Sequence, residues 1–139
     1  MADRFVVDSH ALLALFQDEL GASQVQALLE RANEGDCELF MPVVNLGEAL
    51  YTVERRLGLE AAQEALATFD ELPIEAVAVD RVLALSAARL KAATAVGYAD
   101  CFVAALALQL GATVITGDPG FRRLEGAFTV LWLSASGAA

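Results

Sequence analysis

Residues 5–16 read FVVDSHALLALF, and the position of one acid within this stretch decides the fold. The short apolar run at its start, partly β-branched, predicts a buried strand. Asp8 follows the strand, and a helical pattern over residues 9–16 begins at once, with Asp8 or Ser9 placed to cap it. Open α/β sheets bind ligands at the carboxyl ends of their strands. Asp8 is therefore either a helix cap or one wall of a ligand site.

The rest of the chain alternates between extended and helical patterns. Further strands are expected at residues 38–41, 74–77, 112–116 and 128–133, and further helices at residues 22–32, 43–57, 59–69, from a cap at Asp80 to about 93, 98–110 and, for one turn, 121–124. Apolar residues at 43, 46, 50, 53 and 57 predict the apolar stripe of the helix over 43–57. Such alternation predicts an α/β fold with a five-stranded, doubly wound parallel sheet between two helical layers. We expect a single domain over residues 1–133 and a frayed tail over 134–139.

Composition limits the classes of function. Hydrophobic residues make up 57% of the 139 residues and charged ones 20%, which favours a globular domain over a disordered chain. The net charge is −10, from 19 acidic and 9 basic residues, and this argues against nucleic-acid binding through phosphate contacts alone. The same charge is compatible with an enzyme that reaches phosphate through a divalent cation, or with a basic protein partner.

The chain shows no targeting or membrane signal. Its start, Met1-Ala2-Asp3-Arg4, lacks the features of a signal peptide, and the longest apolar run, near residues 101–108, is too short to span a bilayer. We expect a cytoplasmic protein that does not enter a membrane. Cys37 and Cys101 are 64 positions apart, and we expect free thiols.

Asp100 lies on the helix predicted over residues 98–110, which is apolar almost all round. An unpaired buried carboxylate is costly, so this side chain must be neutral, paired, capping or bound to metal. A carboxylate in the first turn of a helix is also favoured by the helix dipole. The local pattern leaves both explanations open.

Asp118 repeats the placement of Asp8, since it follows the strand over residues 112–116. The sequence Asp-Pro-Gly is ordinary turn chemistry, which explains the residue without any function. Two acids at the ends of neighbouring parallel strands would nevertheless face one crevice.

Glu48 is the fourth candidate acid. Helical periodicity places it with Asn45, Thr52 and Arg55, away from the apolar stripe. This pattern favours a solvated face on which Glu48 lies near Arg55, and leaves open whether Glu48 turns inward.

Considered together, the four acids favour a metal site. Mg²⁺ and Mn²⁺ prefer oxygen ligands, and a cation relieves the repulsion between clustered carboxylates. Hydrolysis of a phosphodiester can use such a site. The single histidine, His10, excludes a His-rich zinc site, and no phosphate-binding loop or Ser-His-Asp set is present. A phosphatase with an aspartyl nucleophile is a weaker alternative, because Asp8 lacks a second Asp two residues on.

The chain resembles the PIN domain family through four motifs that occur in order along nearly its whole length. These are VDS at residues 7–9, Pro42 with Glu48, DCFVAALA at 100–107 and TGDPGF at 116–121. Within the family, the chain is most similar to VapC-type toxins of bacterial and archaeal toxin–antitoxin pairs. The resemblance implies the strand order 3-2-1-4-5, which places the first and fourth strands side by side and agrees with the inferred crevice.

The resemblance also implies an activity, namely a Mg²⁺- or Mn²⁺-dependent endoribonuclease that acts as the toxin of a type II pair. The residues that match the catalytic and metal-binding acids are Asp8, Glu48, Asp100 and Asp118, and Ser9 and Thr116 match supporting hydroxyl residues. It further implies a homodimer that acts on RNA. The implied partner is a VapB-like antitoxin, which inserts a basic segment into the acidic site.

Some residues depart from the family pattern or admit two interpretations. His10 stands where the family commonly has a small residue, and we interpret it as a histidine on the helix surface; a minor role near substrate is the alternative. Arg122 and Arg123 are either a solvated pair or RNA contacts.

The alternative function is a PIN-like binding module with little turnover that acts through a basic protein partner. The net charge favours this alternative, and the intact set of acids counts against it.

Overall fold

Five parallel strands form one sheet in the computed structural model, which describes residues 3–134. The strands are β1 (Asp3–Val7), β2 (Cys37–Pro42), β3 (Ile74–Val77), β4 (Thr113–Thr116) and β5 (Val130–Trp132). Their order is β3-β2-β1-β4-β5, and every pair of neighbours is parallel. The predicted architecture is confirmed, and β1 and β4 lie side by side as expected.

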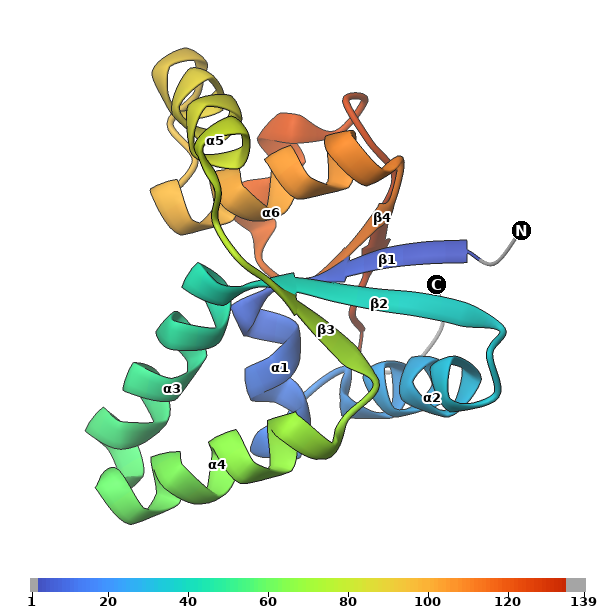
Figure 1. Cartoon of the computed structure of the whole chain (residues 1–139), viewed down its shortest axis with the longest axis vertical. Helices are drawn as coiled ribbons and strands as arrows, with labels where there is room; N and C mark the ends of the chain where they lie inside the picture. The colour runs from blue at the N-terminus through green and yellow to red at the C-terminus, as the bar shows by residue number, and fades with distance from the viewer. Residues whose placement is uncertain (1–2, 135–139) are drawn as a thin grey trace.

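Helices cover both faces of the sheet. They are α1 (Ser9–Phe16), α2 (Ala22–Asn33), α3 (Val43–Leu57), α4 (Leu59–Glu71), α5 (Arg81–Ala93) and α6 (Tyr98–Leu110), with a 3₁₀ helix η1 (Pro119–Leu124). Figure 1 shows α5 and α6 on one side of the sheet and α1 to α4 on the other. This arrangement gives the three layers that the sequence predicts.

The core is divided by the sheet into two parts. Along β1, Phe5 and Val7 pack into the cluster formed with α1 and α2, while Val6 packs into the cluster formed with α6. Successive side chains of a strand point to opposite faces, so a strand buried on both sides reads as a continuous apolar run. This is why residues 5–7 are all apolar.

The structure changes the predicted buried face of α3. The predicted bounds of the helix are confirmed, but Val43 and Leu57 of the expected stripe are 40% and 66% exposed. The buried residues are Asn45, Ala49 and Val53, four apart. The reason is that α3 packs against α1, α4 and α6 as well as the sheet, so a polar residue shares its buried face.

Other differences concern the ends of elements. β5 is shorter than predicted, and β2 is one residue longer at each end, so that Pro42 is both its last residue and the N-cap of α3. Residues 135–139 of the expected frayed tail lie outside the described residues, and the backbone N–H of Ser134 donates to Gln24 Oε1 at 2.7 Å. The two cysteines are free and buried, as expected.

Among residues 3–134, no single helix is long and apolar enough to cross a membrane; α5 and α6 reach that length and composition only as a pair bent by 119°.

Candidate active site

Asp8 lies at the carboxyl end of β1 and is the N-cap of α1. Its Oδ1 accepts the backbone N–H of Ala11 at 2.8 Å, and its Oδ2 accepts the hydroxyl of Thr116. The residue is 1% exposed, and this burial raises the pKa of its carboxyl to about 7, although the two hydrogen bonds lower it. The charges of Asp100 and Asp118 raise the same pKa further. Asp8 is therefore both a helix cap and a member of a group of acids.

Thr116 connects Asp8 to Asp118. It is fully buried at the end of β4, beside β1, and its Oγ1 accepts the backbone N–H of Asp118 at 2.9 Å. The carboxylate Oδ1 of Asp118 accepts the N–H of Gly120 at 2.9 Å and caps η1. The Asp-Pro-Gly turn is therefore ordinary turn structure, and it also holds Asp118 close to the end of β1, where Asp8 lies.

Asp100 stands in the first turn of α6, as predicted. Burial raises the pKa of its carboxyl to about 7, and the charges of Asp118 and Glu48 contribute to the rise. A side-chain hydrogen bond with Asp118 acts in the same direction, because two carboxyl groups can share a hydrogen bond only if one keeps its proton. Asp100 and Asp118 thus influence each other electrostatically, and both line the same hollow.

Glu48 turns inward toward this group. Its Oε1 accepts the hydroxyl of Ser9 at 2.5 Å, a contact that joins α3 to the start of α1. The interpretation of a solvated face with Glu48 near Arg55 is wrong, since the guanidinium of Arg55 lies 4.9 Å over the Tyr51 ring instead. The physical reason is that Asn45, one turn before Glu48, is fully buried, so this face of α3 points into the protein.

Asn45 is a residue that the sequence did not single out for the site. Its Nδ2 donates to the carbonyl oxygen of Ala99 at 3.1 Å, directly before Asp100, and so ties α3 to the first turn of α6. Its Oδ1 is the one buried side-chain oxygen or nitrogen within residues 3–134 that has no hydrogen-bond partner. The available signal was its spacing of three from Glu48, which places both on one helical face.

Asp100 and Asp118 line an open hollow of about 440 Å³ with Gly97 and Arg123. Arg122 does not line this hollow; its guanidinium lies 4.7 Å over the Trp132 ring, and its Nη1 is 3.6 Å from Glu125 Oε1. The two arginines therefore separate, and Arg123 is the one beside the acids.

The donor set suits a hard, hydrated cation. In the part of the chain described, no group of three or more His, Cys, Asp or Glu side chains is arranged to hold one ion. Mg²⁺ commonly keeps several waters and is bound by only one or two carboxylates. The pair Asp100 and Asp118 meets this requirement. The pKa values of Asp8 and Asp100 are raised first by burial and then by the charges of neighbouring carboxylates, which a cation would compensate.

Known proteins share this architecture. The model of the PIN domain family matches residues 5–127. No curated protein matches the chain.

Three solved structures illustrate the similarity. VapBC2 from Rickettsia felis, bound to a DNA fragment from its promoter, aligns at 16% identity with a TM-score of 0.76 and covers 94% of this chain and 99% of that one. DNA-bound VapBC from Salmonella typhimurium aligns at 21% identity with a TM-score of 0.73, covering 94% and 98%. VapC20 from Mycobacterium tuberculosis, described as a sarcin-ricin loop cleaving toxin, aligns at 17% identity with a TM-score of 0.70, covering 87% and 95%.

These identities are low, so the solved structures show a common fold. The family match is broader evidence, because it includes Asp8 and Asp118, which follow β1 and β4, and the helices that carry Glu48 and Asp100. The chain belongs to the PIN domain family.

Proposed function

We propose that this protein is a divalent-metal-dependent endoribonuclease and the toxin of a type II toxin–antitoxin pair. The observation that carries the proposal is that three acids from distant segments meet at the ends of β1 and β4: Thr116 joins Asp8 to the backbone of Asp118, and Asp100 lines the same hollow as Asp118. Burial and repulsion raise the pKa of Asp8 and of Asp100 to about 7, a pattern typical of functional sites. Family membership and the described activity of VapC20 support RNA as the substrate.

Each acid has a role in this proposal. Asp100 and Asp118 would hold Mg²⁺ or Mn²⁺, with Asp8 and Glu48 acting directly or through water. When bound, such an ion lowers the pKa of a coordinated water and stabilises charge on the phosphate and the leaving oxygen. Thr116 and Ser9 support the site by donating hydrogen bonds that fix the carboxylates of Asp8 and Glu48.

The experiment uses a matched pair of variants. Asp80 caps α5 as Asp8 caps α1: its φ is also −91°, and its Oδ1 accepts a backbone N–H, that of Leu83, at 2.8 Å. Both Asp8→Asn and Asp80→Asn retain a capping side chain. We expect Asp8→Asn to abolish Mn²⁺-dependent cleavage of tRNA and rRNA and to relieve growth arrest, while Asp80→Asn retains both. Undiminished cleavage by Asp8→Asn would sink the assignment.

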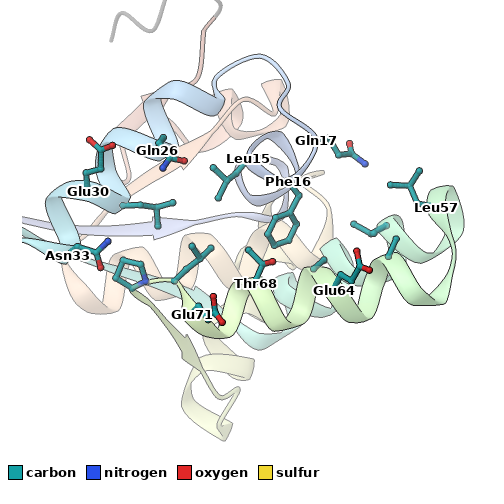
Figure 2. A pocket seen from close by; sticks show the side chains of 16 residues that line it. Leu15, Phe16, Gln17, Gln26, Glu30, Asn33, Leu57, Glu64, Thr68 and Glu71 are labelled. Carbon is teal, nitrogen blue, oxygen red and sulfur yellow. The ribbon is translucent and has the colours of Figure 1, made fainter.

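The partner that we propose is a VapB-like antitoxin with a basic segment. A groove of about 520 Å³ lies between α1, α2, α3 and α4. Figure 2 shows Phe16 among the side chains that line it. Glu30, Glu64 and Glu71 also line it, and the lining contains no Lys or Arg. An amphipathic basic segment of the antitoxin, additional to the one that the family resemblance places in the acidic site, would match the apolar floor and the acidic rim of this groove. Two of the similar structures are VapBC complexes, which supports a partner of this kind.

We also propose a homodimer. On α5, Val82 and Leu85 are 65% and 55% exposed and lie three residues apart, so they share one face. Exposed apolar side chains that gather on one surface commonly mark an interface. A second copy of the chain would cover this face.

The alternative is a binding module with little turnover, and the net charge of −10 is the observation that favours it. Cleavage in Mn²⁺ and in EDTA separates the two functions. Cleavage that requires the metal supports the nuclease. If neither tRNA nor rRNA is cleaved, the binding module is supported.

A further inference from the structure

A second hollow, of about 280 Å³, adjoins the acidic site at Gly117. Gly117 lies between Thr116 and Asp118, and His10, which also lines the hollow, is two residues past Asp8. The hollow therefore begins where both acid-bearing strands end. It is separate from the one that Asp100 and Asp118 line.

His10 packs closely against the backbone of Gly117. A Cβ added at position 117 would lie 2.5 Å from Cε1 of the imidazole, closer than real Cβ contacts allow. Only glycine at this position lets the ring lie against the end of β4. The ring is itself exposed, so it presents a planar surface to the hollow beside the acids.

The remaining lining combines apolar and planar groups. Leu20, which is 60% exposed, and the buried Leu133 contribute apolar surface. The guanidinium of Arg56 is positioned by its Nη1, which donates to Gln17 Oε1 at 3.0 Å. Imidazole and guanidinium planes are the groups on which proteins stack unpaired RNA bases. Glu19 adds a carboxylate, which can accept a hydrogen bond from an amino group of a base.

The charge of the protein favours a base contact in addition to a phosphate contact through the metal. With 9 basic and 19 acidic residues, the chain cannot hold RNA mainly through phosphate contacts. Stacking is insensitive to the charge of the protein, because every base has an aromatic face.

We propose that the hollow formed by His10, Glu19, Leu20 and Arg56 is a base-binding subsite that holds one unpaired base of the RNA, next to the phosphodiester at the acids. This assignment rests on the proposed function for its substrate. Glu19 favours a base with an amino group, which adenine, cytosine and guanine carry, over uracil, which has none.

The test measures nucleoside binding in the metal-free protein and so does not depend on cleavage. Adenosine, cytidine, uridine and ribose are titrated while amide chemical shifts are recorded. We expect adenosine or cytidine to bind about tenfold more tightly than ribose, with shifts at Gly117 and Leu20. His10→Ala and Arg56→Ala should each reduce this affinity about tenfold, and Glu19→Gln should remove the preference over uridine. Arg55→Ala is the matched control, because Arg55 stacks on Tyr51 and does not line the hollow.

Nucleosides that bind no better than ribose, or affinities that His10→Ala and Arg56→Ala leave unchanged, would overturn the subsite. If the wild-type protein cleaves RNA in Mn²⁺ under either of these outcomes, the nuclease stands and the subsite alone fails. If nucleosides bind as expected and no RNA is cleaved, the base pocket stands and the nuclease fails.

Discussion

The hydroxyl of Thr116 donates to Asp8 Oδ2 and at the same time accepts the backbone N–H of Asp118. One buried side chain thus joins the acid after β1 to the turn that carries the acid after β4. Since β1 and β4 are neighbours in the sheet, this contact sets the separation of two acids that are 110 positions apart in sequence. The position of each acid depends on the other strand through this one hydroxyl.

Thr116→Val removes the hydroxyl and keeps the shape of the side chain. The variant leaves the Asp118 N–H and the Asp8 carboxylate without this partner, so we expect a loss of about 1–3 kcal/mol in the free energy of unfolding. Cleavage should fall with it, and Thr116→Ser should retain both. Urea denaturation and Mn²⁺-dependent RNA cleavage measure the two effects. Thr113→Val, at the other end of β4, is the control, and an equal effect there would contradict a specific role for Thr116.

The metal-free protein should lose stability as the pH rises. In the folded chain the pKa of Asp8 is raised from 3.8 to about 7, so the folded state binds more protons than the unfolded state between these values. Each unit of pKa difference corresponds to ~1.4 kcal/mol, so the stability that Asp8 contributes at pH 4 declines through pH 7. Asp8→Asn removes this decline, and Mn²⁺ offsets it in the wild-type protein.

Thermal unfolding in EDTA at pH 5 and pH 8 measures this effect. The difference in Tm between Asp8→Asn and the wild-type protein should grow in favour of the variant as the pH rises. Asp80→Asn, which alters the matched cap on α5, should show no such trend. A difference for Asp8→Asn that stays constant with pH would contradict the role of its raised pKa.

Much of the fold could be predicted from local patterns. The bounds of α3, α5 and α6 follow from helical spacing, from the cap at Asp80 and from the glycine after each of α3 and α6. The strand order came from the family resemblance, because sequence patterns show which segments form strands but not which strands lie next to each other in the sheet. Strand ends such as those of β5 were less predictable, since pairing with a neighbour decides where a strand stops.

The site was also predictable in part, where the position of an acid depends on local sequence. Asp8 and Asp118 were placed by their positions at strand ends, which depend on local sequence. The inward turn of Glu48 was not predictable from the periodicity of α3, because that face is buried by contact with Ser9 and with Ala99 from distant segments. Periodicity reports an apolar stripe, whereas a buried polar face looks the same in sequence as a solvated one.

Asn45 should act by positioning Asp100. Asn45→Ala removes the hydrogen bond to the Ala99 carbonyl, which leaves the first turn of α6 less constrained beside Glu48. We expect weaker Mn²⁺ binding and a lower kcat, with little change in KM, because Asn45 does not line the RNA-facing hollows. Calorimetry of Mn²⁺ binding and steady-state cleavage provide the measurements. A variant that unfolds more easily but binds Mn²⁺ with wild-type affinity would show that Asn45 is only structural.

Leu85→Glu should dissociate the proposed homodimer. The substitution places a charge on the exposed apolar face of α5, where Val82 is its neighbour. Light scattering over a range of concentrations should give a dimer for the wild-type protein and a monomer for the variant. A wild-type protein that remains monomeric at all concentrations would refute the dimer.

Ala65→Arg should separate antitoxin binding from RNA cleavage. Ala65 is half-buried in the lining of the groove on α4, and an arginine there would fill the space between α1 and α4 that we assign to the basic segment. The added positive charge would also repel that segment.

Ala67→Arg is the matched control, because Ala67 is exposed on the same helix and does not line the groove. Each variant is expressed together with the products of the reading frames that flank this gene, and co-purification and Mn²⁺-dependent cleavage are measured. We expect Ala65→Arg to lose the partner and keep its cleavage, while Ala67→Arg keeps both. Retention of the partner by Ala65→Arg would show that the antitoxin binds elsewhere.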